Sequence, residues 1–375
     1  MSIPKIKFKN KKPNYVEFSH DLDFFKLFQK LEKNFKNCFI LESLGEEGNE
    51  SRYHVIGFDP EIIISARGRE LTIRNTRLKK EDKYRVQNPY RTLSKIVPQD
   101  IIARQYAGGL IGYISYEAMN YFESAIDLEP HPHHDQFKFG VYKDGLVYDK
   151  VTGEIFYFYY DENRIDLIQK ISQQKIKKDN LCVKFIRNTK TRAEHKKMVA
   201  DIREEICAGN IFQCVAGFKS EFNIKGDKFL IYEKLREVNP SPYMYYLKFD
   251  SEVIIGASPE LLFGLRQGEM SVYPLAGTIR RGKTEEEDRL LARELLNSKK
   301  DLAEHAMLVD LHRNDIGRVA RFGTVKVRDL MNIKKFSHVQ HISSEVTGFI
   351  KKDKNMFDGL ASNFPMGTVS GAPKI

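Results

Sequence analysis

The stretch Asp301–Val319, DLAEHAMLVDLHRNDIGRV, predicts a long helix and decides the fold class of the second half of the chain. Another predicted helix precedes it and is capped at Thr284–Glu287, where a threonine oxygen can satisfy a free backbone amide. Long strands followed by paired helices predict an α+β fold rather than a doubly wound parallel sheet. The strand-like runs, which predict a meander, are Tyr243–Phe249, Val253–Gly256, Leu261–Leu265 and Met270–Tyr273.

An earlier helix has a well-marked start and end. Thr191–Glu194 is a capping box, and the helix that it opens is expected to end at Gly209, because glycine readily terminates helices in the left-handed conformation. A strand is expected directly afterwards, over Ile211–Phe218.

The first part of the chain reads mostly as strands, rich in β-branched and aromatic residues. Examples are Arg52–Gly57, Glu61–Ala66 and Gly108–Tyr116. One helix, Asp21–Phe35, is predicted from apolar residues at helical spacing. The polar stretch Gln169–Asn180 then predicts a divide between an N-terminal region, 1–168, and a C-terminal region, 181–375.

The composition is that of an ordinary globular protein: 375 residues, 41% hydrophobic and 30% charged. The net charge is +10, but the 61 basic residues are spread along the chain beside 51 acidic ones. This distribution favours solvated faces over a nucleic-acid-binding surface, and it is compatible with an anionic substrate. The four cysteines form no C-x-x-C pair and the basic N-terminus lacks an apolar run, so we expect a cytoplasmic protein without a disulfide framework.

Two carboxylates are candidate metal ligands. Asp301 and Glu304 are three residues apart, so they share one face of the predicted helix. Paired carboxylates on a rigid helix suit Mg2+, which prefers oxygen ligands and keeps several waters. The alternative is structural, because Ser298-x-x-Asp301 is also a capping box.

Four further motifs carry polar groups suited to a ligand. In Asn363–Ile375, NFPMGTVSGAPKI, backbone amides can cradle a carboxylate or phosphate, or form an ordinary tight turn. In Tyr273–Gly282, YPLAGTIRRG, a small-residue turn before two arginines can bind an anion or merely end a strand. Glu260 in ASPE can serve as a general acid if burial raises its pKa, and is otherwise a solvated residue. His341 in VQHISSEV is either catalytic or structural.

Together and in this order, the motifs resemble those of the chorismate-utilising enzymes. This family includes anthranilate synthase component I, aminodeoxychorismate synthase component I, and the isochorismate and salicylate synthases. The match runs from Phe39 to Ile375, and its most specific strings are AEHAMLVDLHRNDIGR (Ala303–Arg318) and FPMGTVSGAPK (Phe364–Lys374). The resemblance implies a large antiparallel-sheet sandwich with flanking helices, in two intimately packed lobes.

Several positions resemble the anthranilate synthase branch most. Gln213 matches the ammonia-using members, and Ala276 stands where aminodeoxychorismate synthases typically carry lysine. The string GTVSGAP also resembles anthranilate synthase more closely. NPSPYM and LES resemble a feedback site for tryptophan, and its lining would be Ser43, Pro242, Tyr243 and Met244.

The resemblance implies that chorismate and ammonia are converted to anthranilate and pyruvate, in tryptophan biosynthesis. Mg2+ would bind the ring carboxylate of chorismate, and a glutamine amidotransferase partner would supply the ammonia. Glu304 matches the metal ligand, and Asp301 stands where the family more often has glutamate. Glu260 would protonate the leaving hydroxyl group. The other matching positions are His341 near the ring, Gln213 on the ammonia side, and Gly277, Thr278 and Thr368 at substrate oxygens.

The sequence departs from the family pattern in two places. Ala216–Gly217 replaces the usual Leu–Ser beside the proposed ammonia site. The chain also ends at Ile375, before the family's second carboxylate pair and the Tyr and Arg residues that hold the pyruvyl group. We therefore expect residues 1–375 to bind Mg2+ and chorismate poorly and to be inactive alone. Aminodeoxychorismate synthase component I is the alternative within the family, and a nucleic-acid-binding protein is the alternative outside it.

Overall fold

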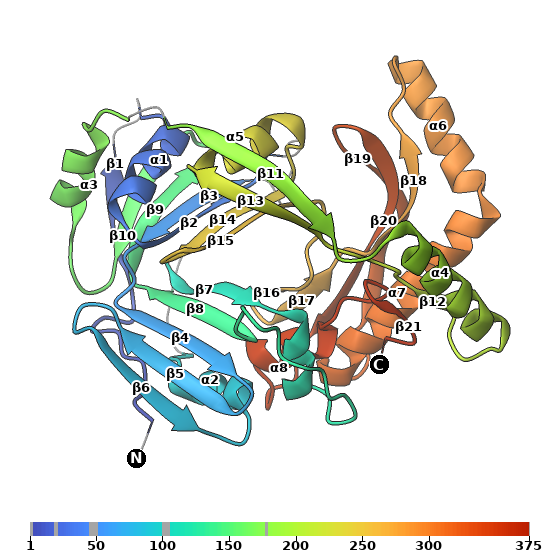
Figure 1. Cartoon of the computed structure of the whole chain (residues 1–375), viewed down its shortest axis with the longest axis horizontal. Coiled ribbons are helices and arrows are strands. Elements are labelled where there is room, and N and C mark those ends of the chain that lie inside the picture. Colours follow the sequence, from blue (N-terminus) through green and yellow to red (C-terminus); the bar gives the residue numbers. More distant parts are fainter. Residues whose placement is uncertain (1–2, 19–21, 45–51, 100–105, 177–178, 375) are drawn as a thin grey trace. The chain divides into compact units, whose positions relative to one another are not determined.

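The computed structural model describes residues 3–18, 22–44, 52–99, 106–176 and 179–374. The chain divides into two compact units (Figure 1). The first unit comprises Met1–Lys178 and Phe229–Ser258, and the second comprises Asp179–Lys228 and Pro259–Ile375. Each unit therefore contains two separate segments of the chain.

The first unit is built on two antiparallel sheets. The seven-stranded sheet has the order β1 (Asn14–Phe18), β10 (Ile155–Tyr159), β9 (Asp144–Asp149), β3 (Tyr53–Phe58), β2 (Asn37–Glu42), β14 (Tyr243–Phe249) and β15 (Glu252–Ser258). The five-stranded sheet has the order β6 (Lys80–Arg85), β5 (Glu70–Asn75), β4 (Ile62–Arg67), β8 (Phe137–Tyr142) and β7 (Gly109–Ile114). The helices are α1 (Phe24–Asn34), α2 (Pro89–Ile96), the 3-10 helix η2 (Tyr116–Tyr121), α3 (Ile165–Ser172) and α5 (Phe229–Val238).

Helix α1 shows how local sequence and packing combine in the first unit. Asp23 caps the helix by accepting a hydrogen bond of 3.0 Å from the Lys26 amide. Its apolar face is buried in a core that also contains Phe229 of α5 and Tyr246 of β14. Burying one such side chain fully contributes about 1.5–3 kcal/mol. This shared core ties the segment Phe229–Ser258 to the N-terminal strands.

The second unit is built on a five-stranded antiparallel sheet with helices beside it. The sheet has the order β16 (Gly264–Arg266), β17 (Glu269–Val272), β20 (Val339–Phe349) and β18 (Leu275–Arg280), and β19 (Lys326–Lys335) also pairs with β20. Two small sheets pair β11 (Leu181–Asn188) with β13 (Ser220–Gly226), and β12 (Gln213–Cys214) with β21 (Gly371–Ala372). The helices are α4 (Arg192–Cys207), α6 (Glu285–Asn297), α7 (Lys299–Val319) and α8 (Met356–Asn363).

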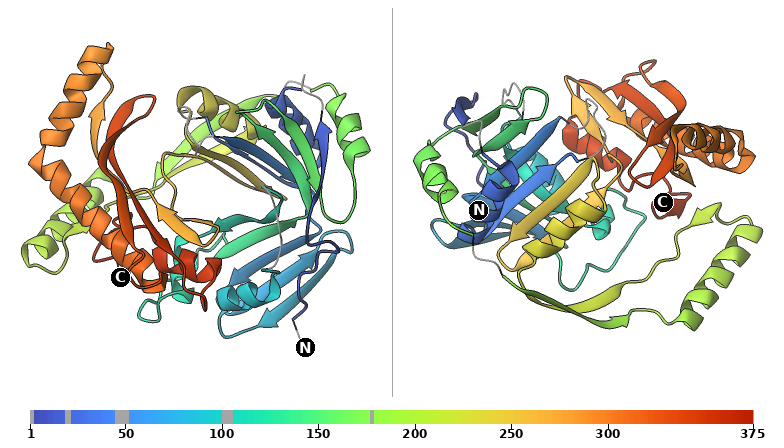
Figure 2. Two further views of the ribbon diagram at one scale, coloured as in Figure 1. Left: turned by 180° about the vertical axis from the view of Figure 1, so that it is seen from behind. Right: turned by 90° about the horizontal axis from the view of Figure 1, so that it is seen from above.

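Helix α7 organises the second unit. It contacts strands β18, β19 and β20 as well as helices α6 and α8. Figures 1 and 2 show α6 and α7 in orange beside these strands. Val309, Ile316 and Val319 of α7 are buried in a core with residues of β17 and β20. This packing fixes the position of the helix against the sheet, and with it the positions of the polar residues on the helix.

The structure confirms the α+β class and most of the expected elements. The capping box at Thr191 and Glu194 is present, and Gly209 follows the helix with φ of 79°. Thr284 and Ser298 cap α6 and α7 as their positions predict. In the described part of the chain, no helix is both long and apolar enough to cross a membrane.

Two strand predictions were wrong. The strand expected over Ile211–Phe218 is reduced to β12, Gln213–Cys214, because the strand that it pairs with, β21, is equally short. The expected meander is split between two sheets: β14 and β15 belong to the first unit, and β16 and β17 to the second. The first unit thus includes residues Phe229–Ser258, which the proposed regions 1–168 and 181–375 do not anticipate.

Candidate functional site

A bulge in β18 brings three of the predicted site residues together. Thr278 lies opposite His341 of β20, and the register shifts between Ala276 and Thr278. Gly277 occupies this shift with φ of 68°, a conformation that glycine adopts without strain. His341 Nδ1 lies 2.9 Å from the Gly277 carbonyl oxygen and 3.1 Å from Thr278 Oγ1. With the proton on Nδ1, the ring donates to the Gly277 carbonyl oxygen, and Nε2 is left as an acceptor.

The start of α7 lies directly against this bulge. A Cβ atom placed on Gly277 would be only 3.1 Å from Cβ of Asp301. Asp301 also accepts hydrogen bonds from the Ser298 hydroxyl and, through its backbone N–H, donates to Ser298 Oγ at 3.3 Å. Ser298 therefore caps the helix through the Asp301 amide, and the Asp301 carboxylate accepts a hydrogen bond from the same capping hydroxyl. Glu304, half-buried, follows one turn later on the same helix.

We expect Gly277→Ala to lower the free energy of unfolding for two separable reasons. The backbone φ at this position is left-handed and therefore strained for alanine, and the new Cβ atom would also crowd the Asp301 side chain. Gly268→Ala is the matched control, because Gly268 has φ of 84° but open space around its Cβ position. Crowding should make Gly277→Ala the more destabilising change by about 1–3 kcal/mol, measured by chemical unfolding. Equal losses in the two variants would show that Asp301 does not pack on the bulge.

Glu260 lies at the entrance to the same strand. Its Oε1 accepts a hydrogen bond of 3.0 Å from the backbone N–H of Leu275, the first residue of β18. Burial raises the pKa of Glu260 to about 7, against the opposing effects of this hydrogen bond and of Lys334. A carboxylic acid that is still partly protonated near neutral pH is suited to give a proton to a leaving group.

A second group of predicted residues is held by the C-terminal loop and the middle of α7. Gln213 pairs with Ala372 in the short ladder of β12 and β21. Thr368 has φ of 61°, and the preceding Gly367 packs on Leu311 of α7. Helix α7 thus contacts both groups: its first turn meets Gly277, and its fourth turn lies against the Gly367 loop.

The residues predicted to bind tryptophan gather in the first unit. Strands β2 and β14 are neighbours, with Met244 opposite Glu42. The Ser43 hydroxyl donates a hydrogen bond to the Pro242 carbonyl oxygen, and the Leu44 amide donates one to the Ser241 carbonyl at 3.0 Å. The LES and NPSPYM strings therefore lie side by side, although they are about 200 positions apart in the chain.

Sequence analysis missed a buried acid–base group beside Ser43. Glu42 accepts hydrogen bonds from Arg236 at 2.8 and 3.0 Å and from the Tyr232 hydroxyl at 2.8 Å. His54 Nδ1 lies 3.5 Å from the same carboxylate. The spacing of Tyr232 and Arg236, four residues apart on α5, was the available signal, because it puts both on one helix face.

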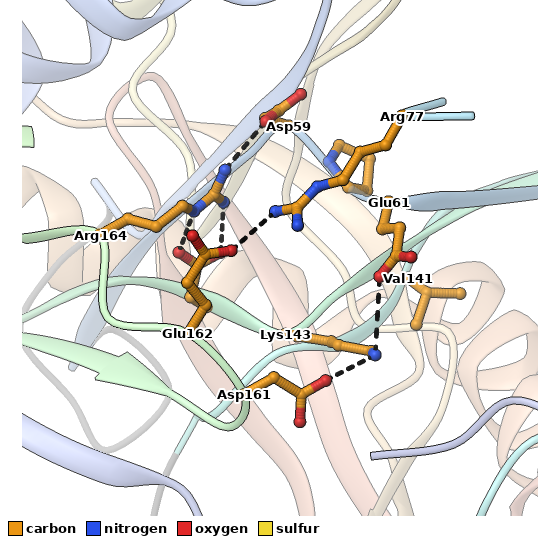
Figure 3. Close-up of a pocket in the computed structure, with 10 residues that line it drawn as sticks. Asp59, Glu61, Arg77, Val141, Lys143, Asp161, Glu162 and Arg164 are labelled. Atoms are coloured by element: carbon orange, nitrogen blue, oxygen red, sulfur yellow. Dashed lines mark hydrogen bonds and ion pairs between the residues drawn. The ribbon is translucent and has the colours of Figure 1, made fainter. Parts of the chain in front are cut away.

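A cavity of about 50 Å³ in the first unit is lined by none of the predicted site residues (Figure 3). Arg164 binds Asp144 and Asp59 there, and Lys143 binds Asp161 at 2.7 Å. Each cation on its wall is thus paired with one or more carboxylates, as in a structural ion-pair network. The lining residues are Asp59, Pro60, Glu61, Arg77, Val141, Lys143, Asp144, Asp161, Glu162 and Arg164.

The donor set on α7 fits a hard cation that is only partly held by protein. In the described ranges, no group of three or more His, Cys, Asp or Glu side chains is arranged around one point. Asp301 and Glu304 offer carboxylate oxygens from a fixed helix, and both are half-buried. Mg2+ commonly takes one or two protein carboxylates and completes its shell with water and substrate oxygens.

Comparison with known proteins places these features in a family. Residues 36–375 match the chorismate binding enzyme family. Anthranilate synthase component 1 of Leptospira biflexa is 48% identical over 381 residues, covering all of this chain and 81% of that protein. The chain belongs to the chorismate-binding enzyme family. Within it, the chain groups with the component 1 proteins of anthranilate synthase, which confirms the resemblance drawn from the sequence motifs.

Further members support the same placement of the chain in the chorismate-binding family. Anthranilate synthase component 1 of Methanothermobacter thermautotrophicus is 41% identical, covering 98% of this chain and 78% of that protein. The crystal structure of anthranilate synthase component I from Streptococcus pneumoniae aligns with a TM-score of 0.72 and 28% identity, covering 88% of this chain and 76% of that one. The fold and the sequence thus lead to the same family.

Proposed function

We propose that this chain is the large subunit of a Mg2+-dependent anthranilate synthase, which converts chorismate and ammonia to anthranilate and pyruvate in tryptophan biosynthesis. The observation that carries the proposal is the grouping of Gly277, Thr278, His341 and Asp301 around one bulge, with Glu260 at the start of the same strand. This grouping occurs in a chain 48% identical to a known component 1 protein.

In this proposal, Glu304 and Asp301 hold the metal ion. When bound, Mg2+ polarises the ring carboxylate of chorismate and stabilises charge that develops on it. Glu304 is the better metal ligand of the two, because the Asp301 carboxylate already accepts a hydrogen bond from the Ser298 hydroxyl. The shorter Asp301 side chain then acts through a water molecule or by supporting Gly277.

The remaining residues of the proposed site bind the substrate and move its proton. Glu260, partly protonated near pH 7, donates its proton to the leaving hydroxyl group. Gly277 and Thr278 hold substrate oxygens at the bulge, and His341 is held beside them by its Nδ1 contacts. Thr368 acts from the C-terminal loop, and Gln213 acts from the neighbouring strand β12, on the side from which ammonia arrives.

The ammonia would come from a glutamine amidotransferase, component 2 of the synthase. The relatives of this chain are called component 1, which implies a second component. Ala276 favours anthranilate synthase over aminodeoxychorismate synthase. Its side chain is buried in β18. The lysine typical of aminodeoxychorismate synthases would have to bury its charged amine at this position. Whether residues 1–375 are active alone stays a prediction.

The metal proposal is tested by measuring chorismate affinity calorimetrically with Mg2+ and with a chelator. The protein expressed from its complete gene is the sample. We expect Mg2+ to strengthen chorismate binding in the wild type. In Glu304→Gln, the affinity measured with Mg2+ should be roughly tenfold or more lower, which corresponds to about 1.4 kcal/mol. Asp310→Asn is the control, because Asp310 is an exposed residue of the same helix. An unchanged Mg2+ effect in Glu304→Gln would refute the assignment of Glu304.

We also propose that tryptophan binds beside Ser43 and inhibits the enzyme. The chain contains no tryptophan, so the fluorescence of the added amino acid reports its own binding. Saturation at 100 times the dissociation constant should stabilise the protein by about 2.7 kcal/mol. Ser43→Ala should weaken binding by removing the hydroxyl that contacts Pro242, whereas Ser251→Ala, at an exposed position, should not. Tryptophan that neither binds nor stabilises the wild type would exclude this site.

A further inference from the structure

Helix α7 carries a buried histidine whose two ring nitrogens are both unpaired. His312 is only 1% exposed. Neither Nδ1 nor Nε2 finds a hydrogen-bond partner among the described residues. His305, seven positions earlier on the same helix, contrasts with it, because its Nε2 lies 2.7 Å from the Ser344 hydroxyl. His305 Nδ1 is also without a partner among the described residues, so His312 differs in that neither of its two ring nitrogens makes a hydrogen bond there.

An unpaired imidazole in this position is costly for the folded protein. Burial, with smaller effects from Lys374 and His305, lowers the pKa of His312 to about 4, so the ring is neutral near pH 7. A neutral imidazole has one donor and one acceptor, and burying both unpaired loses their interactions with water. An apolar side chain of similar size would avoid this loss.

The unpaired nitrogen faces the C-terminal loop. A Cβ atom on Gly367 would be 3.7 Å from Nε2 of His312 and 3.3 Å from Cβ of Leu311, so the loop backbone passes close over the ring. The next residue, Thr368, has φ of 61°, which is strongly disfavoured for a β-branched side chain. A strained backbone and an unpaired buried polar group are thus adjacent, and both features are found where a segment changes its contacts when a ligand binds.

We propose that His312 is a positioning residue for the Gly367–Thr368 turn: in the chorismate-bound enzyme, a backbone N–H of this turn donates a hydrogen bond to His312 Nε2 and fixes Thr368 against the substrate. The inference rests on the proposed function, in which Thr368 binds chorismate. His312 itself does not touch the substrate. It stays unpaired in the free protein, and its hydrogen bond adds to the affinity for chorismate.

The test compares four variants in the protein expressed from its complete gene: His312→Leu, His312→Gln, His312→Asn and, as a control at another histidine, His195→Leu. We expect His312→Leu to keep or raise the melting temperature without ligand and to raise the chorismate KM about tenfold, with a smaller change in kcat. His312→Gln places an acceptor near the Nε2 position and should recover most of the KM. His312→Asn reaches only the Nδ1 position and should not. His195→Leu should leave the chorismate KM unchanged.

The outcomes separate this inference from the proposed function. A wild type that forms no anthranilate from chorismate and ammonium refutes the proposed function. If the wild type is active, an unchanged KM in His312→Leu refutes the positioning role, and so does an equal KM in the Gln and Asn variants. Should the leucine variant fail to fold, the comparison of His312→Gln with His312→Asn decides the question alone.

Discussion

Replacing Glu260 by glutamine should lower kcat for anthranilate formation by about 10²–10⁴-fold, the range expected when a general acid is removed. Glutamine keeps the size of the side chain and the hydrogen bond from the Leu275 amide, but it has no acidic proton to give. The measurement is the fluorescence of anthranilate formed from chorismate, ammonium and Mg2+. Glu286→Gln, at an exposed position of α6, is the matched control and should keep wild-type activity.

The pH dependence gives an independent check on Glu260. Because its pKa in the folded protein is raised from 4.5 to about 7, the folded state binds the proton more tightly than the unfolded state. The stability that this proton contributes is fully present below pH 4.5 and is lost as the pH rises through 7. The wild type should therefore lose stability relative to Glu260→Gln between pH 5 and 8, and its kcat/KM should fall above pH 7. A glutamine variant with normal turnover would rule out Glu260 as the acid.

Replacing Arg236 by methionine should lower the free energy of unfolding by about 3–5 kcal/mol, because it leaves the Glu42 carboxylate buried without its cation. The Glu42 side chain is only 1% exposed, and burial already raises its pKa despite the contacts with Arg236 and Tyr232. The loss is measured by urea unfolding followed by circular dichroism. The effect should be larger at pH 8 than at pH 5, where the isolated carboxylate can take up a proton.

Two further variants identify the cause of that loss. Lys234→Met removes an ion pair with Glu237 on the same helix, but both side chains are mostly exposed, so the cost should stay below about 1 kcal/mol. Adding Glu42→Gln to Arg236→Met removes the unpaired charge and should restore part of the stability. If the double variant is no more stable than Arg236→Met, the loss comes from packing of the arginine on Phe25, its cation–π partner, rather than from charge.

The sequence predicted those features that depend on neighbouring residues. The caps at Thr191, Thr284 and Ser298 need only a side chain and an amide three positions away, and all three are present. The structure groups the segment Phe229–Ser258 with the N-terminal strands, a pairing that no local signal records because its partners in β2 lie about 200 positions earlier.

For the candidate site too, the sequence identified residues but not their arrangement in space. The motifs identified Gly277, His341 and Glu260, but their arrangement depends on the bulge in β18 and on burial at its entrance. Asp301 takes part in the cap of α7, because its backbone N–H donates to Ser298 Oγ, and its side chain also lies against Gly277. The unpaired state of His312 could not be read from the sequence, because it depends on what the fold places around the ring.

Product analysis tests the central claim most directly. The protein expressed from its complete gene is given chorismate, ammonium and Mg2+, and the products are separated and identified by mass and fluorescence. The account predicts anthranilate and pyruvate in equal amounts. Aminodeoxychorismate or isochorismate as the product, with chorismate consumed and no anthranilate formed, would contradict it.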